Sequence, residues 1–152
     1  MYQNHSKGFT LIELLVVIGI IGILSAVVLA SLNTARFKGN DAAIQSDLAA
    51  IQTQSEIYYG GTGGNSYGAA QATCAAAVFS DPTILKAIAG AKTANGGTDL
   101  VCNNTTTAYA ISSKMATERV AGTADYWCVD STGVASKSST ALALLTVCPA
   151  AN

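Results

Sequence analysis

A long apolar run near the N-terminus limits what this chain can fold into. From Leu14 to Leu32 there are 19 consecutive residues without a charged side chain. In an α-helix each residue rises about 1.5 Å, so roughly 20 apolar residues cross a bilayer core of about 30 Å. A helix also satisfies its backbone N–H and C=O groups internally, which lipid requires. The run therefore predicts a membrane-spanning helix.

A secretory signal peptide is the first alternative, because it also has basic residues before an apolar region. Its apolar region is usually about 7 to 15 residues long and ends at small residues, whereas the run here is longer.

Glu13 is the unusual residue, a carboxylate at the start of the apolar stretch. A charged group in a membrane helix costs roughly 2.5 kcal/mol or more, so Glu13 is a functional candidate.

The segment KGFTLIELLVVIGIIGILSAVVLASL, residues 7–32, resembles the N-terminal signature of type IV pilins and type II secretion pseudopilins. That signature is a short polar leader ending in glycine, cleavage before phenylalanine, a glutamate fifth in the new chain, and an apolar helix. Here the leader is MYQNHSKG, cleavage falls between Gly8 and Phe9, and the glutamate is Glu13. The rest of the chain matches the family only in layout.

The resemblance implies how the chain is processed and assembled. A prepilin peptidase is expected to cut after Gly8, where a missing side chain suits close approach of the backbone, and to methylate the amine of Phe9. Glu13 of a neighbouring subunit is expected to neutralise that amine as a paired charge and so set the register of a helical homopolymer. The alternative is that Glu13 pairs with the amine of its own chain. Further implied partners are an assembly ATPase, an inner-membrane platform protein, and lipid before assembly.

The charges around the helix bear on its orientation. Lys7 precedes the helix, whereas Arg36 and Lys38 follow it, which by the positive-inside rule favours a C-terminal end in the cytoplasm. The leader implies the opposite, and we give it precedence. The chain is expected to cross the cytoplasmic membrane once with its N-terminus inside, and to become part of an extracellular pilus after assembly.

An amphipathic pattern extends the helix beyond the lipid. Apolar and small residues recur at helical spacing, and the other faces are polar, so this half is expected to lie against a sheet; the recurring residues are Phe37, Ile44, Leu48, Ile51, Ser55 and Tyr58. A coiled coil is the alternative, but barely two heptads are present. The glycine-rich run GGTGGNSYG, residues 60–68, ends the helix.

A short helix and several strands follow. Asp81 is expected to cap a helix that begins at Pro82 and stops at Asn95-Gly96-Gly97. Strands are predicted at 108–114, 125–129, 134–138 and 141–147, although the last could be helical. The fold class is therefore α+β, a long N-terminal helical spine packed against a small antiparallel sheet, as in the pilin fold. The expected divisions are a leader at 1–8, a transmembrane and polymerisation helix at 9–32, the amphipathic half of the spine at 33–59, a linker at 60–106, and a sheet head at 107–152.

Four cysteines follow the apolar helix and show no zinc-ligand spacing. Outside the cytoplasm an even number favours disulfides, with free core thiols as the alternative. Four cysteines allow three connectivities, and the sequence alone does not choose among them. We expect Cys74–Cys102 and Cys128–Cys148, which close the two shortest non-overlapping loops.

The residues needed for catalysis are absent from the sequence pattern. The single histidine, His5, lies in the leader, the acidic residues are scattered, and no phosphate-binding glycine loop or zinc-binding helix motif is present. We therefore predict that the chain is not an enzyme and needs no cofactor. A net charge of -1 gives no basic excess that would indicate nucleic acid.

Two weaker patterns lie in the head. Asp125 and Asp130 are candidates for Ca²⁺ binding, by resemblance to some pseudopilin heads, although solvated turn aspartates are the simpler interpretation. Asn103 and Asn104 begin two overlapping N-x-[ST] sequons, which indicate an exposed loop.

Three functions fit these patterns. The first is a structural subunit of a type IV pilus filament, and the second is a pseudopilin of a type II secretion system, which shares the same signature. The third is a membrane-anchored binding module that does not polymerise. The third predicts that the chain is not cleaved and that Glu13→Ala has no effect.

Overall fold

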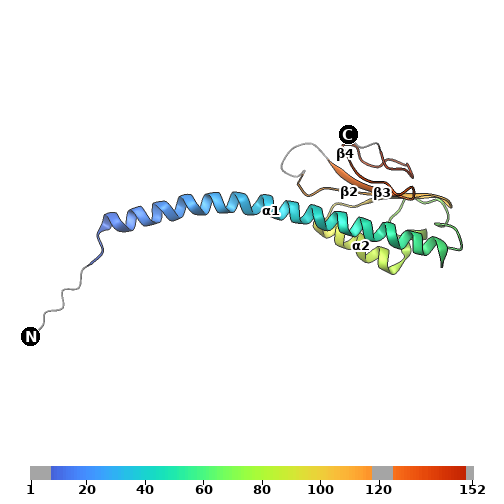
Figure 1. The fold of residues 1–152 in the computed structure, drawn as a ribbon, viewed down its shortest axis with the longest axis horizontal. Coiled ribbons are helices and arrows are strands. Elements are labelled where there is room, and N and C mark those ends of the chain that lie inside the picture. Colours follow the sequence, from blue (N-terminus) through green and yellow to red (C-terminus); the bar gives the residue numbers. More distant parts are fainter. Residues whose placement is uncertain (1–7, 118–124, 150–152) are drawn as a thin grey trace, which may run out of the picture. The chain divides into compact units, whose positions relative to one another are not determined.

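The computed structural model describes residues 8–117 and 125–149. The chain divides into two compact units, Met1–Arg36 and Phe37–Asn152, each described by itself below. Residues 1–7, which hold most of the expected leader including His5, lie outside the described residues. Figure 1 shows the elements in order along the chain.

A single continuous helix, α1 (Leu11–Gly60), dominates the chain. Every residue from Gly8 to Arg36 is exposed, including the whole apolar run. Exposed aliphatic side chains on this scale are unfavourable in water, so this part of the helix needs lipid or other helices around it. By length and composition α1 is able to cross a membrane.

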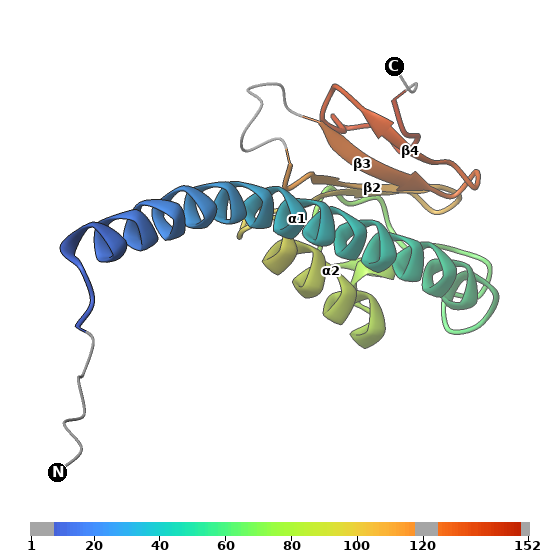
Figure 2. The same ribbon diagram turned by 60° about the vertical axis from the view of Figure 1, so that its left-hand side comes forward.

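The second part of α1 is amphipathic, as predicted. Ile44, Leu48, Ile51 and Ser55 are buried on one face, and Phe37 and Tyr58 pack at the margin of the same core. Because 3.6 residues complete a turn, these positions share one stripe of the helix. Figures 1 and 2 show the sheet and α2 on different sides of this part of α1.

The predicted short helix is α2 (Pro82–Ala94), preceded by the 3₁₀ turn η1 (Ala77–Ser80). The carboxylate of Asp81 accepts hydrogen bonds from the backbone N–H groups of Thr83 and Ile84 at 2.8 and 3.2 Å. This is the N-cap that the sequence indicated. After the helix, Gly96 and Gly97 adopt φ values of 81° and 91°, a left-handed conformation that glycine adopts without strain.

Four antiparallel strands form a sheet in the order β1-β2-β3-β4. They are β1 (Val101–Asn104), β2 (Tyr109–Lys114), β3 (Tyr126–Asp130) and β4 (Ala135–Ser138). The register places Cys102 opposite Ile111, and Ser112 opposite Cys128. Together with the helices, this sheet confirms the predicted α+β fold, a long helix packed against a small antiparallel sheet.

Strand β1 was missed, because it lies in a segment that we expected to be a linker. Its residues Asn103 and Asn104 have low strand propensity, and the expected exposed loop at the sequons is wrong, since both are buried. Hydrogen bonds from the asparagine side chains hold this segment in the sheet despite its low strand propensity. The Asn104 amide donates to the carbonyls of Tyr67 and Ala69 at 3.1 and 2.9 Å, and its backbone forms a bridge with Gln71.

The predicted strand at 141–147 is also wrong, since this segment contains no strand. Two of its backbone carbonyls accept hydrogen bonds from a side chain instead of from a neighbouring strand. The Asn103 amide donates to the carbonyls of Ala143 and Leu145. Leu142 is buried, whereas Leu144 remains 84% exposed, so the apolar composition of the segment reflects one anchor and an exposed loop.

The two faces of the sheet are buried in different ways. The main core lies between α1, α2 and the sheet, where Tyr109, Ile111 and Val129 pack with the α1 stripe. Ala110 and Cys128, which alternate with those residues, form a second cluster with Leu142 and Cys148. The helices thus cover one face of the sheet. The C-terminal segment, residues 139–149, covers part of the other face.

Candidate processing and assembly site

The candidate assembly residue Glu13 lies in the first turn of α1. Its Oε2 accepts hydrogen bonds from the Thr10 N–H at 2.8 Å and from the Thr10 hydroxyl at 2.7 Å. In return, the Glu13 N–H donates to the Thr10 hydroxyl at 3.3 Å. Both N–H groups belong to the helix start, where no intrahelical acceptor exists.

These reciprocal contacts form a capping box, in which a Thr and a Glu three residues later satisfy each other's backbone N–H groups. The role of Thr10 was missed at the sequence level, although the T-x-x-E spacing before an apolar run is its known signal. A negative group in the first turn also favours the positive end of the helix dipole. Glu13 therefore has a structural role at the helix start within its own chain.

The capping box leaves the second carboxylate oxygen of Glu13, Oε1, available for a further contact. Both contacts from Thr10 use Oε2, and Glu13, Phe9 and Gly8 are exposed. Gly8 and Phe9 precede the first residue of α1, so the peptide bond between them lies outside the helix. Such a bond is sterically accessible to a protease, because no helix hydrogen bond has to be broken around it.

Two disulfides tie the head together. The structure joins Cys74 to Cys102 and Cys128 to Cys148, which are the two pairs that close the shortest non-overlapping loops. The first links the loop before η1 to β1, and the second links β3 to the C-terminal segment. Since a disulfide restricts the unfolded chain, each stabilises a part of the head that has little regular structure.

Asp130, one of the two Ca²⁺ candidates, is fully buried at the end of β3. Its Oδ2 accepts from the Cys148 N–H at 2.8 Å, and its Oδ1 accepts from the Thr132 N–H and hydroxyl at 2.9 and 2.6 Å and from the Val134 N–H at 3.3 Å. Burial alone would raise the pKa of Asp130, but these hydrogen bonds together lower it below the usual value. The carboxylate organises the β3–β4 turn and holds the C-terminal segment.

The structure does not bring the two Ca²⁺ candidates together. Asp125 precedes β3 and forms an ion pair with Lys137, whereas Asp130 ends that strand and faces N–H donors. N–H donors are the wrong neighbours for a cation, which needs oxygen ligands. Within residues 8–117 and 125–149, no group of three potential ligating side chains gathers.

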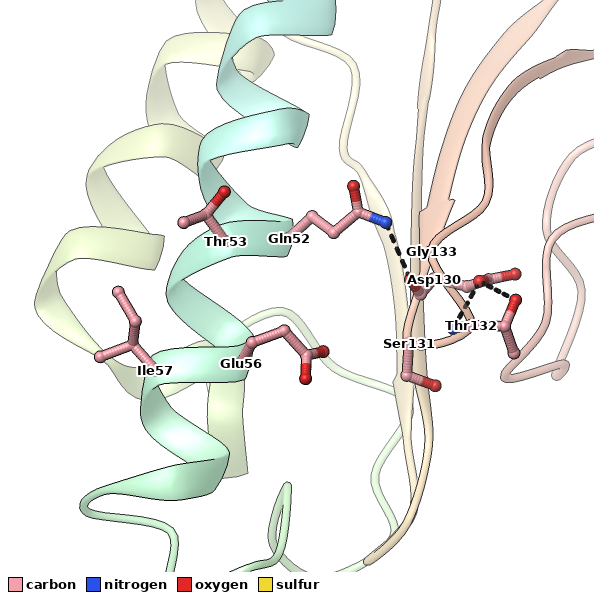
Figure 3. Close-up of a pocket in the computed structure, with 8 residues that line it drawn as sticks. All are labelled: Gln52, Thr53, Glu56, Ile57, Asp130, Ser131, Thr132 and Gly133. Atoms are coloured by element: carbon pink, nitrogen blue, oxygen red, sulfur yellow. Dashed lines mark hydrogen bonds between the residues drawn. The ribbon is translucent and has the colours of Figure 1, made fainter.

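An open groove separates α1 from the β3–β4 turn, as Figure 3 shows. Gln52 crosses it and donates to the carbonyls of Asp130 and Val134 at 3.0 and 3.3 Å. Glu56, on the next turn of α1, accepts from the Tyr67 hydroxyl at 2.8 Å, and burial together with this contact raises the pKa of Tyr67. The polar groups here tie the turn and the glycine-rich loop to the helix.

Two comparisons with known proteins found a match. Residues 3–29 match the family model described as the prokaryotic N-terminal methylation motif. The chain is also 45% identical over 56 residues to the type IV wide pilus major component PilA4 of Thermus thermophilus. That similarity covers 37% of this chain and 43% of the relative's length. The comparison with solved structures found no significant match.

The family match covers the start of α1, whose geometry is described above from Gly8 onward. The methylation motif contains Gly8, Phe9 and Glu13, and the long exposed helix and the small four-stranded sheet have the layout expected of a pilin. Both matches support the assignment of this chain to the type IV pilin and pseudopilin family.

Proposed function

We propose that this chain is a structural subunit of a type IV pilus filament. A prepilin peptidase cleaves it after Gly8 and methylates the new amine of Phe9, and subunits then polymerise through the helix at 9–32. The observation that carries this proposal is the fully exposed apolar half of α1, which begins at an exposed carboxylate, Glu13. Such a surface is stable only in lipid or among other apolar helices.

The location and partners follow from the same proposal. Before assembly the subunit crosses the cytoplasmic membrane once, with its N-terminus in the cytoplasm, and lipid surrounds residues 9–32. Residues 33–59 are then the outer half of the spine, and the linker at 60–106 contributes β1 to the sheet of the head at 107–152. Moving the helix from lipid to a filament exchanges one apolar environment for another, so burial alone drives assembly weakly. An assembly ATPase and an inner-membrane platform protein supply the remaining work.

Glu13 has two roles in this proposal. In the membrane-resident subunit it completes the capping box with Thr10. In the filament it also neutralises the Phe9 amine of a neighbouring subunit, a pair worth more in an apolar surrounding than in water. Pairing with the amine of its own chain is the alternative, since Glu13 already reaches the N–H of the adjacent Thr10 at 2.8 Å.

Two substitutions at Glu13 separate capping from charge neutralisation. Glu13→Gln keeps a side chain that completes a capping box but removes the negative charge, whereas Glu13→Ala removes both. If neutralisation between subunits matters, both variants insert into the membrane and both lose filaments. Filaments that persist in Glu13→Gln and disappear in Glu13→Ala would assign Glu13 to capping alone.

Intact mass spectrometry of material sheared from the native cell surface tests the proposal as a whole. We expect a chain that begins at methylated Phe9 and gains the mass of four hydrogens when its two disulfides are reduced. A processed chain found only in membranes would instead favour a pseudopilin of a type II secretion system. A chain that keeps its residues before Phe9 would favour a membrane-anchored module that does not polymerise.

A further inference from the structure

Two opposite charges on the second part of α1 have no partner among the residues that the structure describes. Lys38 is exposed and Asp47 is half-buried, and within the described ranges 8–117 and 125–149 neither forms a hydrogen bond or an ion pair. The other acidic residues of this part of the helix are engaged. Asp41 accepts from the Thr117 N–H at 3.2 Å, and Glu56 accepts from the Tyr67 hydroxyl.

Asp47 occupies an unusual position for an unpaired carboxylate. It lies against α2 at Gly90, where an added Cβ would come within 2.5 Å of the Asp47 Oδ2. The carboxylate therefore fills space that only a glycine leaves open. Burial raises the pKa of Asp47, and no donor offsets the effect. A partly desolvated charge without a partner is unfavourable in the isolated subunit, so a cation from elsewhere would stabilise it.

The positions of the two charges exclude a contact within one subunit. Asp47 lies nine positions after Lys38 on a continuous helix. This spacing corresponds to about two and a half turns and an axial offset of roughly 13.5 Å. The two side chains therefore point to opposite sides of α1. Complementary groups on opposite sides of one helix favour a heterologous contact, which propagates from copy to copy instead of closing into a dimer.

We propose that Lys38 of one subunit pairs with Asp47 of a neighbouring subunit in the filament. The occupant of this surface is a second, parallel copy of the chain, and the argument for it is charge complementarity on opposite sides of one helix. The solvent side of α1 between the two charges carries the small residues Ala42, Ala43 and Ser46, all exposed, so a neighbour can approach closely. This inference rests on the proposed polymerisation and adds to it a contact between the outer halves of two spines.

Charge reversal tests the pair in assembled filaments. We expect Lys38→Glu and Asp47→Lys each to lower the yield of sheared filaments more than about tenfold, because like charges then meet at every repeated contact. The double variant Lys38→Glu/Asp47→Lys restores the opposite charges and is expected to recover most of the yield. Lys92→Glu, a reversal at an exposed lysine of α2 that is not on the Gly90 face, because it is two positions from Gly90, is the matched control and should leave the yield unchanged.

A zero-length cross-link gives a readout that does not depend on folding of a variant. A water-soluble carbodiimide, applied to native filaments, should join the Lys38 amine to the Asp47 carboxyl as an amide. We expect a peptide that contains both residues in the digest, and a ladder of dimers, trimers and larger species on a denaturing gel. A ladder is expected because each copy offers one amine to one neighbour and one carboxyl to another.

The outcomes separate this inference from the proposed function. Intact filaments in both single variants, no recovery in the double variant, or no Lys38–Asp47 peptide would overturn the pair while leaving polymerisation in place. Cross-linking that stops at dimers would also overturn it, because a closed contact contradicts the opposite placement. If the unaltered chain forms no filaments, the proposed function fails first and the pair fails with it.

Discussion

Replacing Asp130 is the most informative perturbation of the head, because its buried carboxylate joins β3 to the β3–β4 turn and to the C-terminal segment. Its two oxygens serve different segments: Oδ2 accepts from the Cys148 N–H in the C-terminal segment, and Oδ1 accepts from Thr132 and Val134 in the β3–β4 turn. Asp130→Ala removes both. Asp130→Asn has the same size but can accept on one side only, since its amide nitrogen must face donors on the other.

The expected cost follows from burial of the individual contacts. The hydrogen bond from the Cys148 N–H is buried, and a bond to a charged group contributes about 1.5–3 kcal/mol to stability. The donors in the turn are only partly buried, so water replaces the carboxylate there at small cost. We expect Asp130→Ala to lower the free energy of unfolding by about 3 kcal/mol and Asp130→Asn by about half of that.

Urea unfolding of the full chain in non-ionic detergent measures this effect. Trp127 is the only tryptophan and is half-buried at the edge of the core, so its fluorescence reports on the sheet. Asp99→Ala is the matched control, because the Asp99 side chain is 86% exposed and pairs with Lys92 at the surface. Such a pair contributes at most about 1 kcal/mol. Equal losses in the Asp130 and Asp99 variants would refute the reasoning.

The pH dependence supplies an independent check. Because its hydrogen bonds lower the pKa of Asp130 in the folded state, the carboxylate contributes its full stability above the unfolded pKa of about 3.9 and loses it as the pH falls through the folded pKa. The difference in stability between the unaltered protein and Asp130→Asn should therefore be constant near pH 7 and narrow below about pH 4. A difference that is the same at pH 7 and pH 3 would show that the charge is irrelevant.

Three further changes probe other parts of the head by the same urea assay. Asp41→Ala is expected to lower the free energy of unfolding by about 2 kcal/mol, because it leaves the backbone N–H groups that follow β2 without their acceptor; no change would mean that water replaces it. Gly90→Ala should gain less than the about 1 kcal/mol expected from helix propensity, since the new Cβ displaces the Asp47 carboxylate; the full gain would contradict that close packing. Cys148→Ser removes the disulfide to β3 and should cost about 3 kcal/mol, whereas a smaller loss would mean that Asp130 and Leu142 hold the segment without it.

The structure of the N-terminal half of this chain could be predicted from the sequence because its signals are local. An apolar run determines its own helix, since the helix needs no partner to satisfy its backbone groups. The start of α2 was equally local, because Asp81 caps the two N–H groups that follow it. The capping box of Thr10 and Glu13 was readable too, from residues three apart, although only Glu13 was singled out beforehand.

The head was predicted less well because its strands depend on distant contacts. Strands β2, β3 and β4 follow alternating patterns and a turn that sequence inspection can find. Strand β1 instead contains two asparagines, whose amides become favourable only where Tyr67, Ala69 and the C-terminal carbonyls lie within reach. A sequence pattern does not contain those distances.

The sequence by itself determined the long helix, its exposed apolar half, the cap of α2 and the α+β class, because each depends on residues within a few positions of one another. Only the tertiary structure decided that 101–104 is a strand, that 141–147 is not, and that Asp41 and Asp130 are buried anchors. The physical reason is that a buried polar group is stable only where its partners converge. For Asp130 those partners include Cys148, 18 residues further along the chain, and only folding brings the two together.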